Sequence, residues 1–311
     1  MKCAIALSPT TTTPTEPAVQ RITAIDELRR ARAELTGSVA FVPTMGFLHD
    51  GHLALMREGL RRCDHLVVSV FVNPTQFGEG EDLDDYPRDL DGDAEKCRHL
   101  GCDLFFTPQR QAVYPDGDVT RVVVDELGDY LCGPSRPVHF PGVTNVVARL
   151  FNLVAPDVAV FGEKDYQQLA IIRRMVKDLH FPIEICGVPT VREADGLAMS
   201  SRNRYLNNDE REQAICLSRA LVAAYRAYQQ DHSRPVADLV RAATNEIDSR
   251  PLAAIDYVEC VHPDRLTPLA DAEPIGDDGA VMAMAVTIGR ARLIDNLRLD
   301  RALPDGPLRR I

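Results

Sequence analysis

Hydrophobic and polar residues follow two different patterns along this chain, and the change lies near residue 190. Before it, short, nearly continuous apolar runs alternate with segments whose apolar residues recur at helical spacing. Such a run predicts a strand buried on both faces of a parallel sheet, and helical spacing predicts a helix that covers the sheet. The first part therefore has the pattern of an α/β domain. We expect strands at 39–42, 66–72, 102–107, 157–161 and 183–189, and helices at 22–35, 53–62, 94–100, 143–154 and 166–178.

A second pattern begins near residue 209. Two helix-patterned segments, 209–230 and 236–249, precede three strand-patterned segments. Helices followed by adjacent strands indicate an α+β unit with an antiparallel sheet, and hence a second, smaller domain. The three strands are expected at 255–261, 280–288 and 291–299.

Two shorter segments complete this division. Residues 1–17 contain a run of Ser, Pro and Thr without periodicity, which predicts a disordered tail. Residues 121–124 predict one further small strand, placed at an edge of the first sheet. We expect a tail at 1–17, a first domain at 18–190, a C-terminal α+β domain at 191–301 and a second tail at 302–311.

The composition is that of an ordinary globular chain and excludes several functions. The 311 residues carry a formal net charge of −11, which argues against general affinity for nucleic-acid backbones, because that affinity needs clustered Lys and Arg. None of the eight cysteines forms a Cys-x-x-Cys pair, so a reducing cytoplasm fits better than a disulfide framework or a zinc site. The N-terminal apolar patch is too short for a signal peptide, and no segment is long enough to span a bilayer.

The stretch 43–52, Pro-Thr-Met-Gly-Phe-Leu-His-Asp-Gly-His, joins the first strand to the next helix. His49 and His52 both reach the first turn of that helix, where unpaired N–H groups and the positive end of the dipole favour an anion. Two imidazoles there suit a phosphate. Gly46 and Gly51 carry no Cβ and let a bulky ligand approach the backbone. Two histidines at this spacing also often share a helix face for packing alone.

Polar residues follow a second strand at the edge where parallel sheets bind ligands. Asn73 and Gln76 come directly after the strand at 66–72, although turn formation before a proline is the simpler explanation for Asn73. Farther on, a loop rigidified by three prolines holds one guanidinium, Arg136, and one imidazole, His139.

An acidic loop at 79–93 contains Tyr-Pro-Arg and three alternating aspartates. Asp89, Asp91 and Asp93 could help to hold magnesium. Alternating acids before a helix are more often a solvated N-terminus that matches the helix dipole, and we favour that interpretation.

Two charged clusters follow later strands. In Gly-Glu-Lys-Asp-Tyr-Gln-Gln at 162–168, Lys164 can place a mobile positive charge on phosphate oxygens and Asp165 can accept from ribose hydroxyls. The alternative is a helix N-terminus with an Asp cap and an ion pair within the helix.

The second cluster begins at Met199 and combines hydroxyl and guanidinium groups. Ser200 and Ser201 with Arg202 and Arg204 suit a phosphate, and Gly196 gives the segment freedom to move over a site. A basic linker is the alternative.

Five motifs stand in a fixed order along the chain. They are Pro43-Thr-Met-Gly with His49-x-x-His52, Phe71-Val-Asn-Pro-x-Gln-Phe77, Arg136-Pro-x-His-Phe140, Phe161-Gly-Glu-Lys-Asp165 with Gln167-Gln168, and Met199-Ser-Ser-Arg-Asn203. Together they resemble the pantoate–β-alanine ligase (pantothenate synthetase) family over about 22–299, and Arg292-Leu-Ile-Asp-Asn296 is similar too. The chain also resembles the wider HxGH nucleotidylyltransferases and class I aminoacyl-tRNA synthetases, whose mobile Lys-Met-Ser-Lys-Ser loop corresponds to 199–202 here.

The resemblance implies a fold and a reaction. The fold is a Rossmann-like, doubly wound parallel sheet that binds ATP and pantoate, with a small C-terminal lid domain, in a homodimer that requires magnesium. Pantoate carboxylate attacks the α-phosphorus of ATP and gives pantoyl adenylate and pyrophosphate. The amine of β-alanine then attacks the acyl carbon and gives pantothenate and AMP. The implied partners are small molecules, and neither nucleic acid nor a membrane is expected.

The resemblance also assigns roles to residues of this chain. In-line displacement at phosphorus spreads negative charge over oxygens, so the protein mainly supplies cations and hydrogen-bond donors. The expected catalytic set is His49, His52, Lys164, Ser200, Ser201 and Arg202. The expected ATP-binding set adds Met45, Gly46, Phe47, Leu48, Asp50, Gly51, Gly162, Glu163, Asp165, Val191 and Met199. The expected set for pantoate and β-alanine is Met45, Asn73, Gln76, Tyr86, Arg136, His139 and Gln168. No set of metal ligands is assigned to the protein alone.

The chain departs from the family pattern at two positions. Cys132 stands where an acid is usual, which leaves open what supports Arg136 and His139. Gly92 interrupts the acid pair after Tyr-Pro-Arg, which weakens any carboxylate role in placing magnesium.

Two other functions remain open on the sequence. A nucleotidylyltransferase acting on a phosphate ester would line its acceptor pocket with Arg or Lys, whereas Gln76 and Gln168 are neutral and suit pantoate. A non-catalytic nucleotide sensor would be expected to lose phosphate contacts, yet His49, His52 and Lys164 are all present. The acidity of the chain and the lack of an anticodon-reading extension disfavour tRNA charging.

Overall fold

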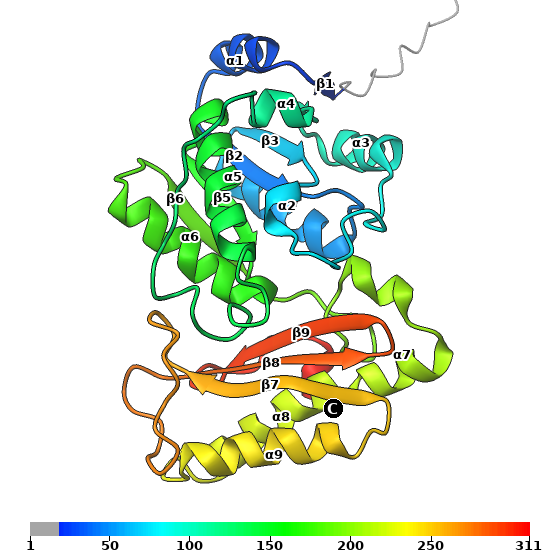
Figure 1. The fold of residues 1–311 in the computed structure, drawn as a ribbon, viewed down its shortest axis with the longest axis vertical. Coiled ribbons are helices and arrows are strands. Elements are labelled where there is room, and N and C mark those ends of the chain that lie inside the picture. Colours follow the sequence, from blue (N-terminus) through cyan, green and yellow to red (C-terminus); the bar gives the residue numbers. More distant parts are fainter. Residues whose placement is uncertain (1–18) are drawn as a thin grey trace, which may run out of the picture.

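The computed structural model describes residues 19–311, so the tail expected at 1–17 lies outside the described residues. An α/β unit and a smaller sheet-and-helix unit are stacked along the long axis of the molecule (Figure 1). The α/β unit is built on a six-stranded sheet in the order β1-β4-β3-β2-β5-β6, and every neighbouring pair is parallel. Its strands are β1 (Gln20–Ile22), β2 (Val39–Thr44), β3 (His65–Val70), β4 (Leu104–Phe106), β5 (Val158–Gly162) and β6 (Glu184–Val188).

Helices cover both faces of this sheet, which explains the continuous apolar runs of its strands. In β2, Val39 and Phe41 pack into the core on one face and Ala40 and Val42 into the core on the other, and all four are fully buried. A strand covered on both sides needs apolar residues at every position. The covering helices are α1 (Ile25–Glu34), α5 (His139–Val154) and α6 (Tyr166–Asp178) on one face, and α2 (Asp50–Arg62) and α3 (Leu90–Leu100) on the other, with a short α4 (Arg110–Val113).

The strand order reverses beside β2. From β2 the chain moves outward through β3 and β4 on one side, and later through β5 and β6 on the other. Open α/β sheets bind ligands in the crevice outside the carboxyl ends of the strands at such a switch point. The segments that leave β2 and β5 here are the histidine stretch 43–52 and the charged cluster 162–168.

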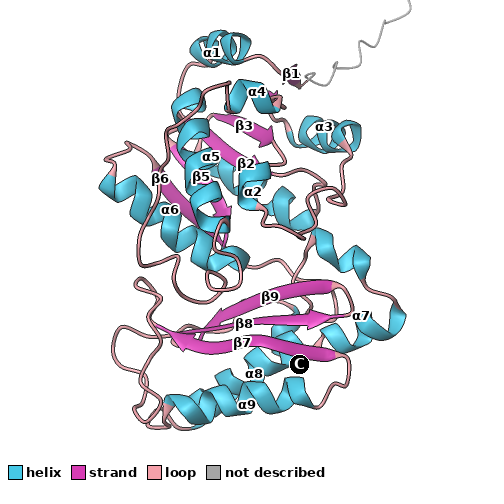
Figure 2. Cartoon of the chain, in the orientation of Figure 1, coloured by secondary structure: helices cyan, strands magenta, loops and turns pink. Residues whose placement is uncertain are grey.

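The smaller unit has a three-stranded antiparallel sheet in the order β7-β8-β9, with helices on one face (Figure 2). Its edge strand β9 lies nearest the α/β unit. The predicted fold class, a doubly wound parallel sheet with a smaller α+β part, is confirmed. The elements are α7 (Asn208–Ala214), α8 (Cys216–Gln230), α9 (Val236–Asp248), β7 (Ala253–Val261), β8 (Val281–Ile288) and β9 (Ala291–Arg298).

Two local expectations differ from the structure. The small strand at 121–124 is wrong, since β1 occupies the sheet edge beside β4. The Val122 carbonyl there accepts from Thr144 on α5 instead of from a strand. The segment 302–311, expected as a tail, carries the 3₁₀ helix η4 (Pro307–Arg310) and buries Leu308 in the C-terminal core. Within residues 19–311, no helix is both long and apolar enough to cross a membrane.

Candidate active site

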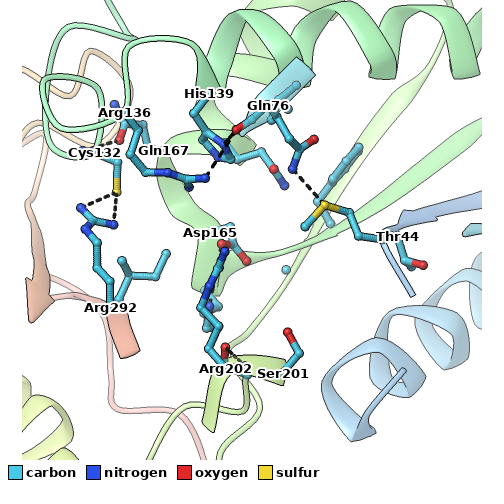
Figure 3. A pocket seen from close by; sticks show the side chains of 18 of the residues that line it. Thr44, Gln76, Cys132, Arg136, His139, Asp165, Gln167, Ser201, Arg202 and Arg292 are labelled. Carbon is cyan, nitrogen blue, oxygen red and sulfur yellow. Dashed lines mark hydrogen bonds and ion pairs between the residues drawn. The ribbon is translucent and has the colours of Figure 1, made fainter. Parts of the chain in front are cut away.

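A cleft of about 680 Å³ opens between the carboxyl ends of β2 and β5 and the edge strand β9. Loops from both units form its walls, and Figure 3 shows their polar side chains turned toward the common space. The cleft therefore brings together residues that lie more than 150 positions apart. The predicted residues that line it are Met45, His49, Gly51, His52, Asn73, Gln76, Tyr86, Arg136, His139, Gly162, Lys164, Asp165, Gln168, Val191, Met199, Ser200, Ser201 and Arg202.

Five predicted ATP-binding residues do not line the cleft. Gly46 and Phe47 have positive φ angles of 87° and 52° and form the tight turn after β2. Leu48 is buried in the core, and Asp50 faces a small side cavity. These four residues shape the loop. Glu163 also does not line the cleft, and its carbonyl accepts a hydrogen bond from Asn296 of β9.

Asp93 holds this turn from the neighbouring helix α3. Its carboxylate accepts from the N–H groups of Phe47 (2.8 Å) and Leu48 (2.7 Å), and it is fully buried. The expectation of a solvated acid is therefore wrong for Asp93. Asp89 does cap α3, and Asp91 is exposed beside Arg21, so the three aspartates do not converge on a metal. No group of three or more metal-ligating side chains occurs in the described part of the chain.

His49 and His52 form a capping box at the start of α2. The Nδ1 atom of His49 accepts from the Gly51 N–H (3.2 Å), and the Nδ1 atom of His52 accepts from the His49 N–H (3.3 Å). An Nδ1 that accepts places the proton of a neutral imidazole on Nε2. The two rings lie 4.1 Å apart between centroids, so the cap fixes two adjacent Nε2–H donors.

Both imidazoles are neutral near pH 7 in the folded protein. Burial, followed by the charge of Lys164, lowers the pKa of His49 to about 4. Burial, followed by the neighbouring His49, lowers the pKa of His52 to about 3. The pair therefore offers hydrogen bonds to an anion, and Lys164 supplies the positive charge.

This neutrality predicts how stability depends on pH. An unfolded histidine binds a proton near pH 6.5, whereas folded His52 does so only near pH 3, so the free energy of unfolding falls as the pH drops from 6.5 toward 4. His52 contributes a slope of at most about 1.4 kcal/mol per pH unit in this window. Urea unfolding between pH 7 and 4.5 should show a shallower loss in His52→Asn than in the wild type, with the exposed His180→Asn as control. Equal slopes for His52→Asn and the wild type would contradict a neutral His52.

Lys164 and Asp165 stand at the start of α6. The Lys164 ammonium lies 3.8 Å from the Asp165 carboxylate, and its side chain is 20% exposed. Asp165 occupies the N-cap position of α6, but its side chain makes no capping hydrogen bond. The capping alternative therefore does not account for Asp165, which leaves its carboxylate available to a ligand in the cleft.

Gln76 and Gln168 both line the cleft. The Gln76 amide nitrogen lies 3.1 Å from the Met45 sulfur, and its oxygen accepts from Asn73 (3.1 Å). Asn73 is itself buried, and its amide also contacts Thr75, Tyr114 and Gly142, so it orients Gln76. Gln168 makes no side-chain hydrogen bond within residues 19–311.

Position 132 is a cysteine where the family usually has an acid, and other groups hold Arg136 and His139 in place. Glu81 accepts two hydrogen bonds from Arg136, and the Gln76 carbonyl accepts from His139 Nδ1 (3.0 Å). Burial, followed by the charge of Arg136, lowers the pKa of His139 to about 4. The Cys132 thiol instead faces Arg292, as Figure 3 shows.

The Met199–Arg202 segment begins beside the histidine stretch, since Met199 and Ser200 line one small side cavity together with His49. It follows a small hairpin in which Met199 donates to the Val191 carbonyl, and Gly196 turns the hairpin with φ +100°. Gly196 is therefore required by the turn. Arg202 makes a two-bond ion pair with Asp82 (3.0 and 2.7 Å), so its guanidinium has a carboxylate partner in this structure.

Sequence reasoning missed the contribution of the second sheet. Arg292, Ile294 and Asn296 of β9 line the cleft, and Tyr257 of β7 lies beside them. The three β9 residues alternate along the strand and so share one face. The alternation in Arg292-Leu-Ile-Asp-Asn296 is the sequence signal for this shared face. It points to the cleft only once it is known that this face of β9 packs against the other unit.

The chain is similar to known proteins over almost its whole length. The family model described as pantoate-beta-alanine ligase matches residues 18–298. A pantothenate synthetase of Citrifermentans bemidjiense is 50% identical over 275 residues, which are 88% of this chain and 97% of that protein. The crystal structure of pantothenate synthetase from Thermus thermophilus has a TM-score of 0.84 and 48% identity and covers 90% of this chain and 99% of that one. A Francisella tularensis pantoate-beta-alanine ligase, solved with β,γ-ATP and β-alanine, has a TM-score of 0.73 and 32% identity over 92% of this chain and 99% of that one.

Proposed function

Since this chain belongs to the pantoate–β-alanine ligase family and forms pantothenate with ATP, we propose that the described cleft carries out both steps of that reaction. One observation carries this proposal. One wall of the cleft, at the strand switch point, carries hydrogen-bond donors and positive charge from His49, His52 and Lys164. A second wall carries the neutral amides of Gln76 and Gln168. The first wall suits a triphosphate and the second suits a hydroxy acid.

In the first step, pantoate carboxylate attacks the α-phosphorus of ATP. Negative charge then grows on the leaving pyrophosphate, and fixed donors stabilise it most where water is excluded. The Nε2–H groups of His49 and His52 and the Lys164 ammonium hold the triphosphate from one side. Ser200, Ser201 and Arg202 hold it from the other, and Arg202 exchanges Asp82 for phosphate.

The nucleoside lies beside Asp165. Asp165 accepts hydrogen bonds from the ribose hydroxyls, and backbone groups near Gly162, Val191 and Met199 hold adenine. The Rossmann-like domain at 18–190 binds ATP and pantoate, and the domain at 191–301 acts as a lid.

Gln76 and Gln168 hold the hydroxyls and carboxylate of pantoate. Because the amides are neutral, they orient the carboxylate without the charge pairing that would weaken it as a nucleophile. The backbone N–H of Met45 helps to orient it, and Tyr86, Arg136 and His139 complete the acid side. Closure of the cleft protects the acyl adenylate from water until the β-alanine amine attacks its acyl carbon.

The proposed site would hold magnesium together with ATP. Mg²⁺ usually keeps several waters and binds through substrate phosphates with one or two carboxylates. Asp82 and Asp85 line the cleft and fit such a supporting role, whereas Asp89, Asp91 and Asp93 are separated or already used. Magnesium neutralises charge on the triphosphate when it is bound.

A homodimer in the cytoplasm is the expected setting. The seven described cysteines are free and buried, which fits a reducing compartment.

The products of a complete reaction test the proposed chemistry. With MgATP, pantoate and β-alanine, we expect pantothenate, AMP and pyrophosphate in equal amounts, measured by chromatography. ADP and inorganic phosphate in place of AMP and pyrophosphate would contradict an adenylate intermediate.

The variant Gln76→Ala tests the acid side of the cleft. It removes an amide that is held against Met45 and Asn73, so the KM for pantoate should rise by about tenfold or more while the KM for ATP changes little. Steady-state kinetics with each substrate varied in turn would measure both. An equal effect on the two KM values would move Gln76 out of the pantoate pocket.

A further inference from the structure

The edge strand β9 contacts two ATP-site segments through adjacent residues. It packs against the 3₁₀ helix η2 (Glu163–Asp165), which carries Lys164, and against η3 (Ser201–Tyr205), which follows Ser200. Both contacts run from the C-terminal sheet to loops that lie outside it. A rigid strand in this place can set how far apart the two loops stand.

Asn296 makes the first contact. Its side-chain amide donates to the Glu163 carbonyl (3.0 Å) and to the Lys164 carbonyl (2.8 Å), and the residue is 9% exposed. Two hydrogen bonds to successive carbonyls fix the orientation of the backbone from which the Lys164 side chain extends. Only a side chain with two N–H donors in a fork can make both bonds.

Asp295, on the opposite face of β9, contacts the hairpin that leads into Met199 and η3. Its carboxylate accepts two hydrogen bonds from Arg192 (2.6 and 2.8 Å), and the two side chains are 0% and 3% exposed. Arg192 also donates to the Gly196 carbonyl and pairs with Ala198 across the hairpin. The hairpin that leads into Met199 is therefore anchored to β9 as well.

We propose that Asp295 and Asn296 form a brace that sets the spacing between the two ATP-binding loops, and that Asn296 is a positioning residue for Lys164. The brace rests on the proposed function, since it gives Lys164 and the Met199–Arg202 segment their part in adenylation. Asn296 contacts backbone carbonyls only, so it acts on the reaction through the loop. A misplacement of about 1 Å at a reacting group can cost about a hundredfold in rate.

Asn296→Ala and Asn296→Asp test the brace. We expect pantoate-dependent pyrophosphate–ATP exchange to fall by about ten- to a hundredfold in both, with the KM for pantoate and the Tm of the free enzyme nearly unchanged. In Asn296→Asp, an ionised carboxylate would turn lone pairs toward the two carbonyls, whereas a protonated carboxyl can donate to one of them. The exchange rate of Asn296→Asp relative to Asn296→Ala should therefore rise as the pH falls from 8 to 6, an effect that a purely structural role would not produce.

A double variant shows whether the effect passes through Lys164. If it does, adding Asn296→Ala to Lys164→Ala should lower the exchange rate by less than twofold beyond Lys164→Ala alone. Gln229→Ala is the matched control, because its amide donates to the Leu299 carbonyl within the same unit and away from the cleft. It should keep the wild-type exchange rate.

Three results would overturn the brace: exchange in Asn296→Ala within twofold of wild type, a fully additive loss in the double variant, or a rise in the pantoate KM equal to the loss of exchange. Should Asn296→Ala fail to fold, Asn296→Ser, which keeps one donor, is judged by the same criteria. Normal exchange in Lys164→Ala would instead contradict the proposed function itself. A loss there together with normal exchange in Asn296→Ala would contradict the brace alone.

Discussion

His52→Ala and Lys164→Ala are each expected to lower the rate of adenylation by about a hundredfold or more, with folding unchanged. That scale is typical for the loss of one preorganised donor or charge at a site where negative charge develops. The His52 Nε2–H is fixed by the cap at the start of α2, and burial keeps this imidazole neutral. Lys164 places its ammonium beside Asp165 and close enough to lower the pKa of both histidines.

Single-turnover formation of pantoyl adenylate in a rapid-quench instrument measures this loss directly. Lys177→Ala is the matched control, because Lys177 lies exposed on the same helix, α6, and does not line the cleft. Circular dichroism and the Tm report folding. Wild-type adenylation in either active-site variant would remove that residue from the proposed mechanism.

Asp295→Ala is expected to destabilise the protein by about 3–5 kcal/mol, the cost of leaving a buried charge without its partner. Arg192 is 3% exposed, and its Nε atom already lacks a hydrogen-bond partner in the structure. Removing Asp295 therefore leaves a buried guanidinium whose charge is unpaired and whose remaining hydrogen-bond partner is the Gly196 carbonyl. Guanidinium unfolding followed by fluorescence or circular dichroism gives the change in free energy.

Two comparisons make this result specific. Asp238→Ala removes an exposed ion pair with Arg241 and should cost no more than about 1 kcal/mol. The double variant Arg192→Met/Asp295→Leu removes both charges and should be more stable than Asp295→Ala. A cost below about 1 kcal/mol for Asp295→Ala would show that the pair is not the buried anchor described here.

The α/β part of the fold could be predicted because its signal is local. Strands such as 39–42 are covered on both faces, so every position is apolar and the run is visible without its partners. The segment 121–124 has similar residues but is no strand, and the carbonyl of Val122 accepts from the Thr144 side chain of α5 instead. The periodicity of apolar residues indicates which positions are buried. It does not indicate which donor forms a hydrogen bond with a given backbone carbonyl.

Most of the candidate site follows from one rule, since parallel strands bring their carboxyl ends to one edge. The rule placed His49, Gln76 and Lys164 in the same crevice, which the structure shows as one cleft. The rule makes no prediction for Asn296, because this residue lies on an antiparallel strand of another unit. Nor could it show that Asp93 is buried, because its partners are the backbone N–H groups of a distant turn.

Pantoate-dependent exchange of radiolabelled pyrophosphate into ATP, in magnesium buffer without β-alanine, tests the central claim most directly. Reversible formation of pantoyl adenylate in the cleft predicts label in ATP only when pantoate is present. Binding of ATP without any pantoate-dependent exchange would contradict the adenylate mechanism and the roles assigned to the cleft residues.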